Sequence, residues 1–144
     1  MKPRLGAYTL TTNKAKLDVD AIHRFLCESY WARGIARETV ARSIEHSRVY
    51  AVLHGKALAG FARVVTDQAT FAYLADVFVL EEHRGRGLAR WLVQSIIEDP
   101  ELAGIRRWLL VTRDAHRLYA RFGFRLVEDP GRFMEIVRPH VAEA

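Results

Sequence analysis

The sequence of 144 residues contains a single cysteine and no long apolar run. No stretch approaches the roughly 18–20 consecutive apolar residues that a membrane span requires. The N-terminal stretch MKPRLGAYTL shows neither the apolar core nor the cleavage site of a signal peptide. Because Cys27 is alone, an internal disulfide and a metal site built from several cysteines are both excluded. We therefore expect a cytoplasmic protein without membrane contact and without a bound metal.

Lysine is also scarce, so the positive charge of the chain comes mainly from arginine. Only four of the 22 basic residues are lysines, and the formal net charge is +5. A basic chain of this kind can bind nucleic acid. The arginines are spread along the sequence, however, with a local excess after residue 84. A cofactor that carries several phosphates explains this excess at least as well, and we do not expect nucleic acid to be the main partner.

Neither internal repeats nor an interdomain linker divides the chain. Its length fits one domain that is large enough to bury a core. Half of the residues are apolar and 27% are charged, which is ordinary for a globular protein. We expect a single domain over residues 1–144, with a folded core from about residue 7 to 137. The composition is compatible with a homodimer.

The spacing of apolar residues predicts a mixed sheet with helices along the chain. The first half should contain a strand at 7–11, a helix through 21–26 capped by Asp18 or Asp20, a helix at 37–46, and an antiparallel meander of strands at 48–53, 57–65 and 71–80. Gly60 lies within the second strand of this meander, which suggests a bulge or a close approach by another group.

In the second half of the chain, the same spacing predicts a helix from Leu88 that ends before Pro100, followed by a strand at 107–112. Because a helix separates this strand from 71–80, the two should be parallel. Asp114 should cap a short helix that Gly123 ends. The runs 124–127 and 132–137 should then pair as a closing hairpin.

The turn after residue 80 has the features of an anion site. An apolar strand ends there, Arg84-Gly85-Arg86-Gly87 follows, and helical periodicity begins at Leu88. The free N–H groups and the positive dipole end of a helix N-terminus favour a phosphate or pyrophosphate. The turn has no Lys-Ser/Thr pair after its glycines, as a Walker A loop has, and no three-glycine dinucleotide fingerprint.

Two motifs resemble those of the GCN5-related N-acetyltransferase (GNAT) family. The pattern Arg-x-x-Gly-x-Ala, formed by Arg84, Gly87 and Ala89, resembles the acyl-CoA pyrophosphate loop of that family. The second pattern, Ala115-x-x-Leu-Tyr-x-x-Phe-Gly-Phe, ends at Phe124 and is similar to the family's A-x-x-L-Y-x-x-x-GF helix. The resemblance covers about residues 7–137. It implies an α/β fold with a central mixed sheet of about seven strands flanked by about four helices.

The resemblance implies acetyl-CoA as the cofactor. The pyrophosphate would bind the backbone of Arg84, Gly85, Arg86, Gly87, Leu88 and Ala89. A side chain at Gly87 would obstruct the phosphate, and the sharp bend of the loop requires Gly85. The pantetheine arm would pair, like an added strand, with Val77, Phe78 and Val79. Many family members carry Asn where this chain has Thr112, whose hydroxyl can still donate to a pantetheine carbonyl.

Acetyl transfer to an amine needs a base for the amine, a donor for the oxyanion and an acid for the departing thiolate. Tyr119 matches the family's thiolate-protonating tyrosine, which makes it the candidate acid and a cofactor contact; a packing role is the alternative. Asp76 is the candidate base and a substrate contact, because burial inside an apolar strand would raise its pKa. Asp76 could equally accept a loop N–H, with the proton leaving through water. Tyr30 and Trp31 should contact the acceptor.

The leading hypothesis is an acetyl-CoA-dependent N-acetyltransferase. It would move the acetyl group to a primary amine of a small molecule by direct transfer in a ternary complex. The alternatives are a non-catalytic acyl-CoA-binding sensor, an acetyltransferase for protein or peptide amines, and a nucleic-acid-associated module.

Overall fold

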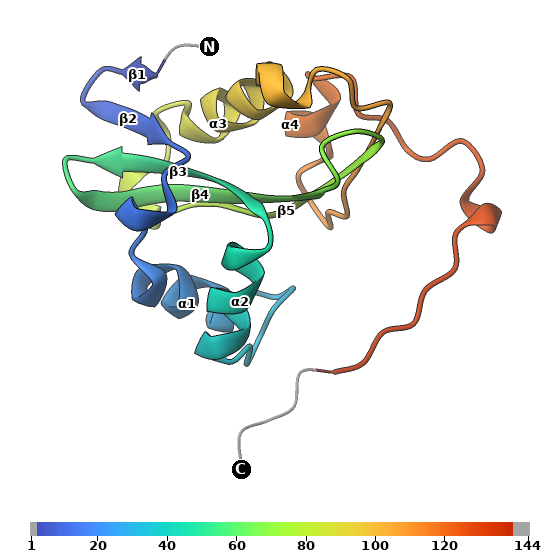
Figure 1. Cartoon of the computed structure of the whole chain (residues 1–144), viewed down its shortest axis with the longest axis horizontal. Coiled ribbons are helices and arrows are strands. Elements are labelled where there is room, and N and C mark those ends of the chain that lie inside the picture. The colour runs from blue at the N-terminus through green and yellow to red at the C-terminus, as the bar shows by residue number, and fades with distance from the viewer. Residues whose placement is uncertain (1–2, 140–144) are drawn as a thin grey trace.

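The computed structural model describes residues 3–139 and shows a mixed sheet between two layers of helices (Figure 1). Helices α3 and α4 lie over one face, and α1 and α2 lie over the other. The described residues form six strands and four α-helices, in the order β1 (Arg4–Leu5), β2 (Tyr8–Thr11), α1 (Val19–Glu28), α2 (Arg37–Glu45), β3 (Arg48–His54), β4 (Ala57–Thr66), β5 (Phe71–Val79), α3 (Leu88–Ile97), β6 (Arg107–Leu109) and α4 (His116–Ala120). The predicted α/β class is thus confirmed, with six strands where about seven were expected.

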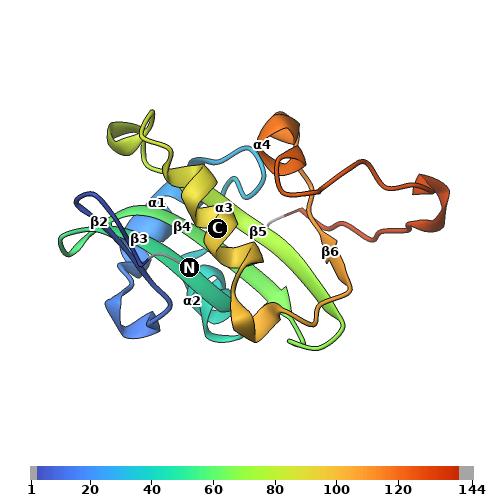
Figure 2. The same cartoon turned by 90° about the horizontal axis from the view of Figure 1, so that it is seen from above.

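The strands follow one another across the sheet in sequence order, from β1 to β6. All neighbours are antiparallel except β5 and β6, which are parallel. Helix α3 lies between β5 and β6 in the chain. It crosses one face of the sheet, so the chain can enter β6 in the same direction as β5 (Figure 2). The predicted meander and the predicted parallel pair are both confirmed.

The helices begin and end where local chemistry favours it. The Asp18 side chain caps α1 by accepting a hydrogen bond from the N–H of Ala21 at 3.0 Å, which resolves the choice between Asp18 and Asp20. Helix α1 buries Ile22 and Leu26 on one face, and α2 buries Val40 and Ile44. This spacing of four residues turns one apolar stripe of each helix toward the sheet.

A buried polar network fastens the end of α3 to β3. Asp99 is only 3% exposed, and its Oδ2 accepts hydrogen bonds from Nη2 of Arg48 at 2.7 Å and from the Tyr50 hydroxyl at 2.5 Å. The other carboxylate oxygen accepts from the N–H of Glu101 at 2.9 Å. Charged groups at such depth are stable only when they are paired in this way.

The close approach predicted at Gly60 is confirmed. A Cβ at this position would lie 3.1 Å from the carbonyl oxygen of Phe78 on the neighbouring strand. The pairing of β3 with β4 also shifts register between Val52 and Leu53, opposite this glycine. Gly60 therefore allows β4 and β5 to pack tightly at the end of the sheet that leads into the turn.

The C-terminal hairpin predicted from 124–127 and 132–137 is wrong. Neither run is a strand, and between them Pro130–Arg132 forms a single 3₁₀ turn. The N–H of Arg132 bonds to the carbonyl of Asp129, and the N–H of Phe133 to that of Pro130. The chain bends at this turn, and the two runs do not come to lie side by side (Figure 1).

Strand β6 is shorter than expected, since it ends at Leu109 and not at residue 112. Strand β1, two residues long, was not predicted, because so short a segment has no readable period. No helix among residues 3–139 is long and apolar enough to cross a membrane.

Candidate active site

Strands β5 and β6 pair over only part of their length. Their register joins Phe71 to Arg107 and Tyr73 to Leu109, and within the described residues it ends there. Strand β5 continues to Val79, so the edge of residues 74–79 that faces β6 has no strand beside it in the described sheet. This free edge includes the residues predicted to pair with pantetheine, which are Val77, Phe78 and Val79.

The turn between β5 and α3 adopts a conformation that requires glycine. Gly85 and Gly87 have φ angles of 78° and 77°, in the left-handed region that other residues rarely adopt. No side chain of the described chain caps α3, and the amides of Leu88, Ala89 and Arg90 have no acceptor among the described residues. Open space lies beside both glycines, which leaves room for an anion.

The two arginines of the turn differ in their contacts. The Nε of Arg84 donates to the carbonyl of Val79 at 2.9 Å, which fixes the turn to the end of β5. Arg86 is exposed to solvent. Arg84 therefore shapes the turn as well as adding charge, whereas Arg86 can contribute its charge to a ligand in the turn.

Asp76 occupies a bulge in β5 beside the free edge. Its φ of 55° is unusual for a residue with a side chain, and the β4–β5 register shifts between Phe61 and Arg63, opposite it. The Asp76 side chain is 10% exposed and bonds through Oδ2 to Nε of Arg63 at 2.9 Å. Its Oδ1 accepts a hydrogen bond from the indole N–H of Trp31 at 2.9 Å.

The loop at residues 29–35 reaches across this region. The Tyr30 ring packs edge-on against the ring of Trp31, with centroids 5.1 Å apart. The guanidinium of Arg113, beyond β6, lies 3.8 Å from the Tyr30 ring centroid, and the Arg113 N–H donates to the Tyr30 hydroxyl at 3.2 Å. The loop is therefore fastened at Asp76 on one side and at Arg113 on the other.

Tyr119 of α4 lies close to the same loop. Its ring is buried and packs edge-on against Phe124 at 5.9 Å. Burial, and to a lesser degree the charge of nearby Tyr30, raise the pKa of Tyr119 to about 12. The phenol is therefore protonated at neutral pH and can donate. The structure thus brings Tyr119, Tyr30, Trp31 and Asp76 to one region.

The prediction that Asp114 caps α4 is wrong, because Ala115 is the N-cap residue and no side chain of the described residues caps this helix. The N–H of Ala115 donates to the Thr112 hydroxyl at 3.0 Å, and the Asp114 side chain is exposed beside Arg113. The chain turns between Thr112 and Ala115, which brings the Thr112 hydroxyl within hydrogen-bond distance of the Ala115 N–H. Thr112 retains its own hydroxyl hydrogen as a donor.

The sequence interpretation missed Arg63, Ser47 and Arg113. Arg63 is a lone charge within an apolar strand, which is the same signal that identified Asp76, and the hairpin places the two side by side. Its Nη1 also donates to the Ser47 hydroxyl at 3.1 Å. Arg113 gives no comparable signal, because its contact with Tyr30 joins residues 83 positions apart.

Comparison with known proteins agrees with this arrangement. Residues 19–124 match the family model described as the acetyltransferase (GNAT) family. The crystal structure of a candidate GNAT acetyltransferase from Xanthomonas campestris pv. campestris is 42% identical, with a TM-score of 0.91 over 95% of this chain and 97% of that one. A curated candidate acetyltransferase from Gibberella zeae is 29% identical and covers 81% of this chain and 77% of its own. A predicted acetyltransferase from Clostridium acetobutylicum, crystallised with acetyl-CoA, shares the fold, with 12% identity, a TM-score of 0.67, and coverage of 90% of this chain and 96% of that one.

Proposed function

The chain belongs to the GNAT family of acetyltransferases, and we propose that it moves an acetyl group from acetyl-CoA to the primary amine of a small molecule. The amine would attack directly within a ternary complex. The observation that supports this most is the free edge of β5, which runs from the open glycine turn to the Asp76 bulge. A single domain over residues 1–144, whose ends lie outside the described residues, and a cytoplasmic location are part of the same proposal.

The residues present fit acetyl-CoA. The free amides of Leu88, Ala89 and Arg90, with the charge of Arg86, suit a pyrophosphate. The unpaired backbone of residues 77–79 suits an extended amide-bearing arm, and the Thr112 hydroxyl can donate to one of its carbonyls. Acetyl-CoA supplies an activated thioester, whose carbonyl carbon accepts the amine and whose sulfur departs.

Tyr119 is proposed as the group that donates to the departing sulfur. Its phenol hydrogen stays in place at neutral pH, because burial raises the pKa of Tyr119 to about 12. The hydroxyl can therefore stabilise the negative charge that develops on sulfur and deliver a proton there. A rate loss caused by ionisation of Tyr119 should appear only as the pH approaches 12.

We propose that Asp76 binds the amino group of the acceptor. An ionised carboxylate can accept about four hydrogen bonds, and those from Arg63 and Trp31 occupy two of these positions. The remaining lone pairs can accept from the incoming ammonium and take its proton, directly or through a water. The Trp31 bond fixes the carboxylate beside the loop that would contact the acceptor.

The loop at 29–35 favours a small acceptor with an apolar body. Tyr30 and Trp31 are 44% and 40% exposed, so their rings present an aromatic surface to a ligand. Such rings can contact both the hydrocarbon part of an amine and its cation. The loop has no acidic residue between 30 and 35, which argues against acceptors with several positive charges.

The proposal is tested by acetyl-CoA turnover with a panel of amines, amino acids and peptides, for the wild type and Tyr119→Phe. We expect turnover with at least one small amine and a strong loss in the variant. Tight CoA binding without turnover on any amine would identify a sensor instead. Turnover with peptides alone would indicate that the acceptor is a protein or peptide amine.

A further inference from the structure

Arg113 brings a positive charge to the site that the proposed acetyl transfer does not use. Its guanidinium lies over the Tyr30 ring, 3.8 Å from the ring centroid, and its backbone N–H donates to the Tyr30 hydroxyl at 3.2 Å. These two contacts hold Arg113 beside the loop at residues 29–35, which would contact the acceptor. The guanidinium therefore lies where part of an acceptor can reach it.

The Arg113 guanidinium has most of its hydrogen-bonding capacity unused. A guanidinium carries five N–H donors. Within the part of the chain that the structure describes, its one ion pair is with Asp114, at 3.9 Å, and the two side chains are 66% and 68% exposed. A pair of this length and exposure contributes little. An oxygen of a ligand can therefore take the place of water at these donors without breaking a buried contact.

The Tyr30 hydroxyl adds a second donor at the same place. It accepts from the Arg113 N–H, so its own hydrogen remains available to a ligand. Tyr30 is exposed, which leaves this hydrogen accessible. A planar guanidinium matches the two oxygens of a carboxylate through parallel hydrogen bonds, and the phenol can add a third. The pair of residues therefore suits a carboxylate.

The charges on this side of the loop also favour an anionic group. Residues 29–35 contain Arg33 and no acidic residue, and residues 106–113 contain three arginines and no acidic residue. Asp76 lies on the other side of the loop, where its carboxylate accepts a hydrogen bond from Trp31. The loop thus has a carboxylate that suits an ammonium on one side and a guanidinium that suits a carboxylate on the other.

We propose that the acceptor is an amino carboxylic acid, whose amine binds at Asp76 and whose carboxylate binds at Arg113 and the Tyr30 hydroxyl. This inference rests on the proposed acetyl transfer and narrows its acceptor. The amine nitrogen gains the acetyl carbon, the carbon–sulfur bond breaks and the sulfur takes a proton, so the carboxylate is unchanged. Arg113 is a specificity-determining residue, because its contact orients the molecule at a second point.

The test compares acceptors in matched pairs that differ in the carboxylate. Each α-amino acid is paired with its amide, and each ω-amino acid, from β-alanine to 6-aminohexanoate, with the alkylamine in which a methyl group replaces the carboxylate. The kcat/KM of each acceptor is measured at saturating acetyl-CoA. For at least one acid we expect it to exceed that of its partner by about 10- to 100-fold, as hydrogen bonds to a charged group provide.

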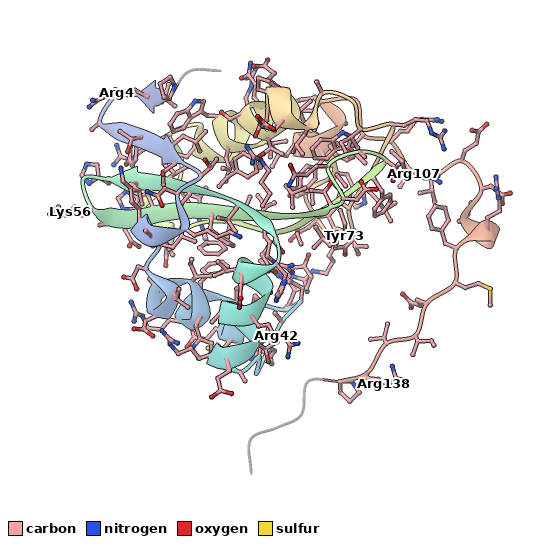
Figure 3. All side chains as sticks on the ribbon, viewed as in Figure 1. Arg4, Arg42, Lys56, Tyr73, Arg107 and Arg138 are labelled. Carbon is pink, nitrogen blue, oxygen red and sulfur yellow. The ribbon has the colours of Figure 1, made fainter. Side chains whose placement is uncertain are left out.

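Arg113→Gln should remove this preference, mainly through a higher KM, so that the kcat/KM of the acid falls to that of its partner. If Arg113 only held the loop in place, the variant would lower both members of the pair alike and the preference would remain. Arg113→Lys keeps the charge but not the planar fork, and should restore part of the preference. The matched control is Arg42→Gln, at an exposed arginine of α2 below the sheet (Figure 3), which should leave the preference intact.

Titration calorimetry with each acid, on protein saturated with CoA, gives a readout that does not depend on turnover. We expect binding of the preferred acid to the wild type and none to Arg113→Gln. Equal kcat/KM within every pair, or a preference that persists in Arg113→Gln, would overturn the inference while acetyl transfer to amines still stands. Binding through Arg113 without turnover of any amine would instead contradict the proposed transfer. The absence of both turnover and binding would overturn both.

Discussion

Asp76 and Asp99 are both acids paired with an arginine, yet their surroundings give them different tasks. Asp99 is enclosed by Arg48, Tyr50 and the Glu101 amide, so its carboxylate has no access to a ligand. Asp76 lies at a bulge beside an unpaired strand edge and retains free lone pairs. We therefore assign Asp99 to stability and propose Asp76 for chemistry.

Asp99→Ala should destabilise the fold by about 3 kcal/mol at neutral pH, because it leaves the half-buried Arg48 without its carboxylate. Urea unfolding measures this loss. The matched control is Asp20→Ala, which removes an exposed pair with Arg37 and should leave the free energy of unfolding nearly unchanged. Equal losses for the two variants would contradict the role given to Asp99.

The contribution of Asp99 should also depend on pH. Burial alone would raise the pKa of this carboxyl, but the hydrogen bonds from Tyr50, the Glu101 amide and Arg48 outweigh burial and bring the pKa below 3.8. A lowered pKa in the folded state stabilises the protein above the ordinary value of the unfolded chain, and the stabilisation is lost as the pH falls through the folded value. The difference in unfolding free energy between wild type and Asp99→Ala should therefore be constant near neutral pH and shrink below about pH 4.

At the scale of elements, the sequence predicted what depends on local pattern. The hairpin of β3 and β4, strand β5 and the first three α-helices have clear periods and turn or cap signals, and the structure confirms them. The length of β6 and the conformation of residues 124–139 depend on tertiary contacts. Local patterns in a single sequence do not predict such contacts. The same applies to the site, because Arg63 and Arg113 belong to it through tertiary contacts with Asp76 and Tyr30.

Gly87→Ala tests the turn between β5 and α3. Alanine at a φ of 77° costs about 1–2 kcal/mol, and relief of this strain would reorient the amides of the first turn of α3. We expect the KM for acetyl-CoA to rise about tenfold, measured by steady-state kinetics. The matched control is Gly104→Ala, where φ is not positive and an added Cβ meets nothing within 4 Å, so neither stability nor KM should change. An unchanged KM in Gly87→Ala would contradict the cofactor role of the turn.

At the scale of the whole molecule, the net charge of +5 should assist capture of a polyphosphate cofactor. We expect the KM for acetyl-CoA to rise with ionic strength while kcat stays constant, because salt screens exposed charges beyond roughly 10 Å at 0.1 M. Acetyl-pantetheine, which lacks the phosphates, is the matched control and should show no salt dependence. An equal salt effect on the KM of both acetyl donors would contradict a role of the net positive charge in capturing the phosphates.

The central claim is that α4 supplies the acid for acetyl transfer at the free edge of β5. Tyr119→Phe removes one oxygen and keeps the ring packed against Phe124, so the fold and acetyl-CoA affinity should be nearly unchanged. The single-turnover rate with a saturating acceptor amine measures the chemical step directly. The account predicts a loss of about 100-fold or more in that rate. A Tyr119→Phe variant that transfers the acetyl group at the wild-type rate would contradict it.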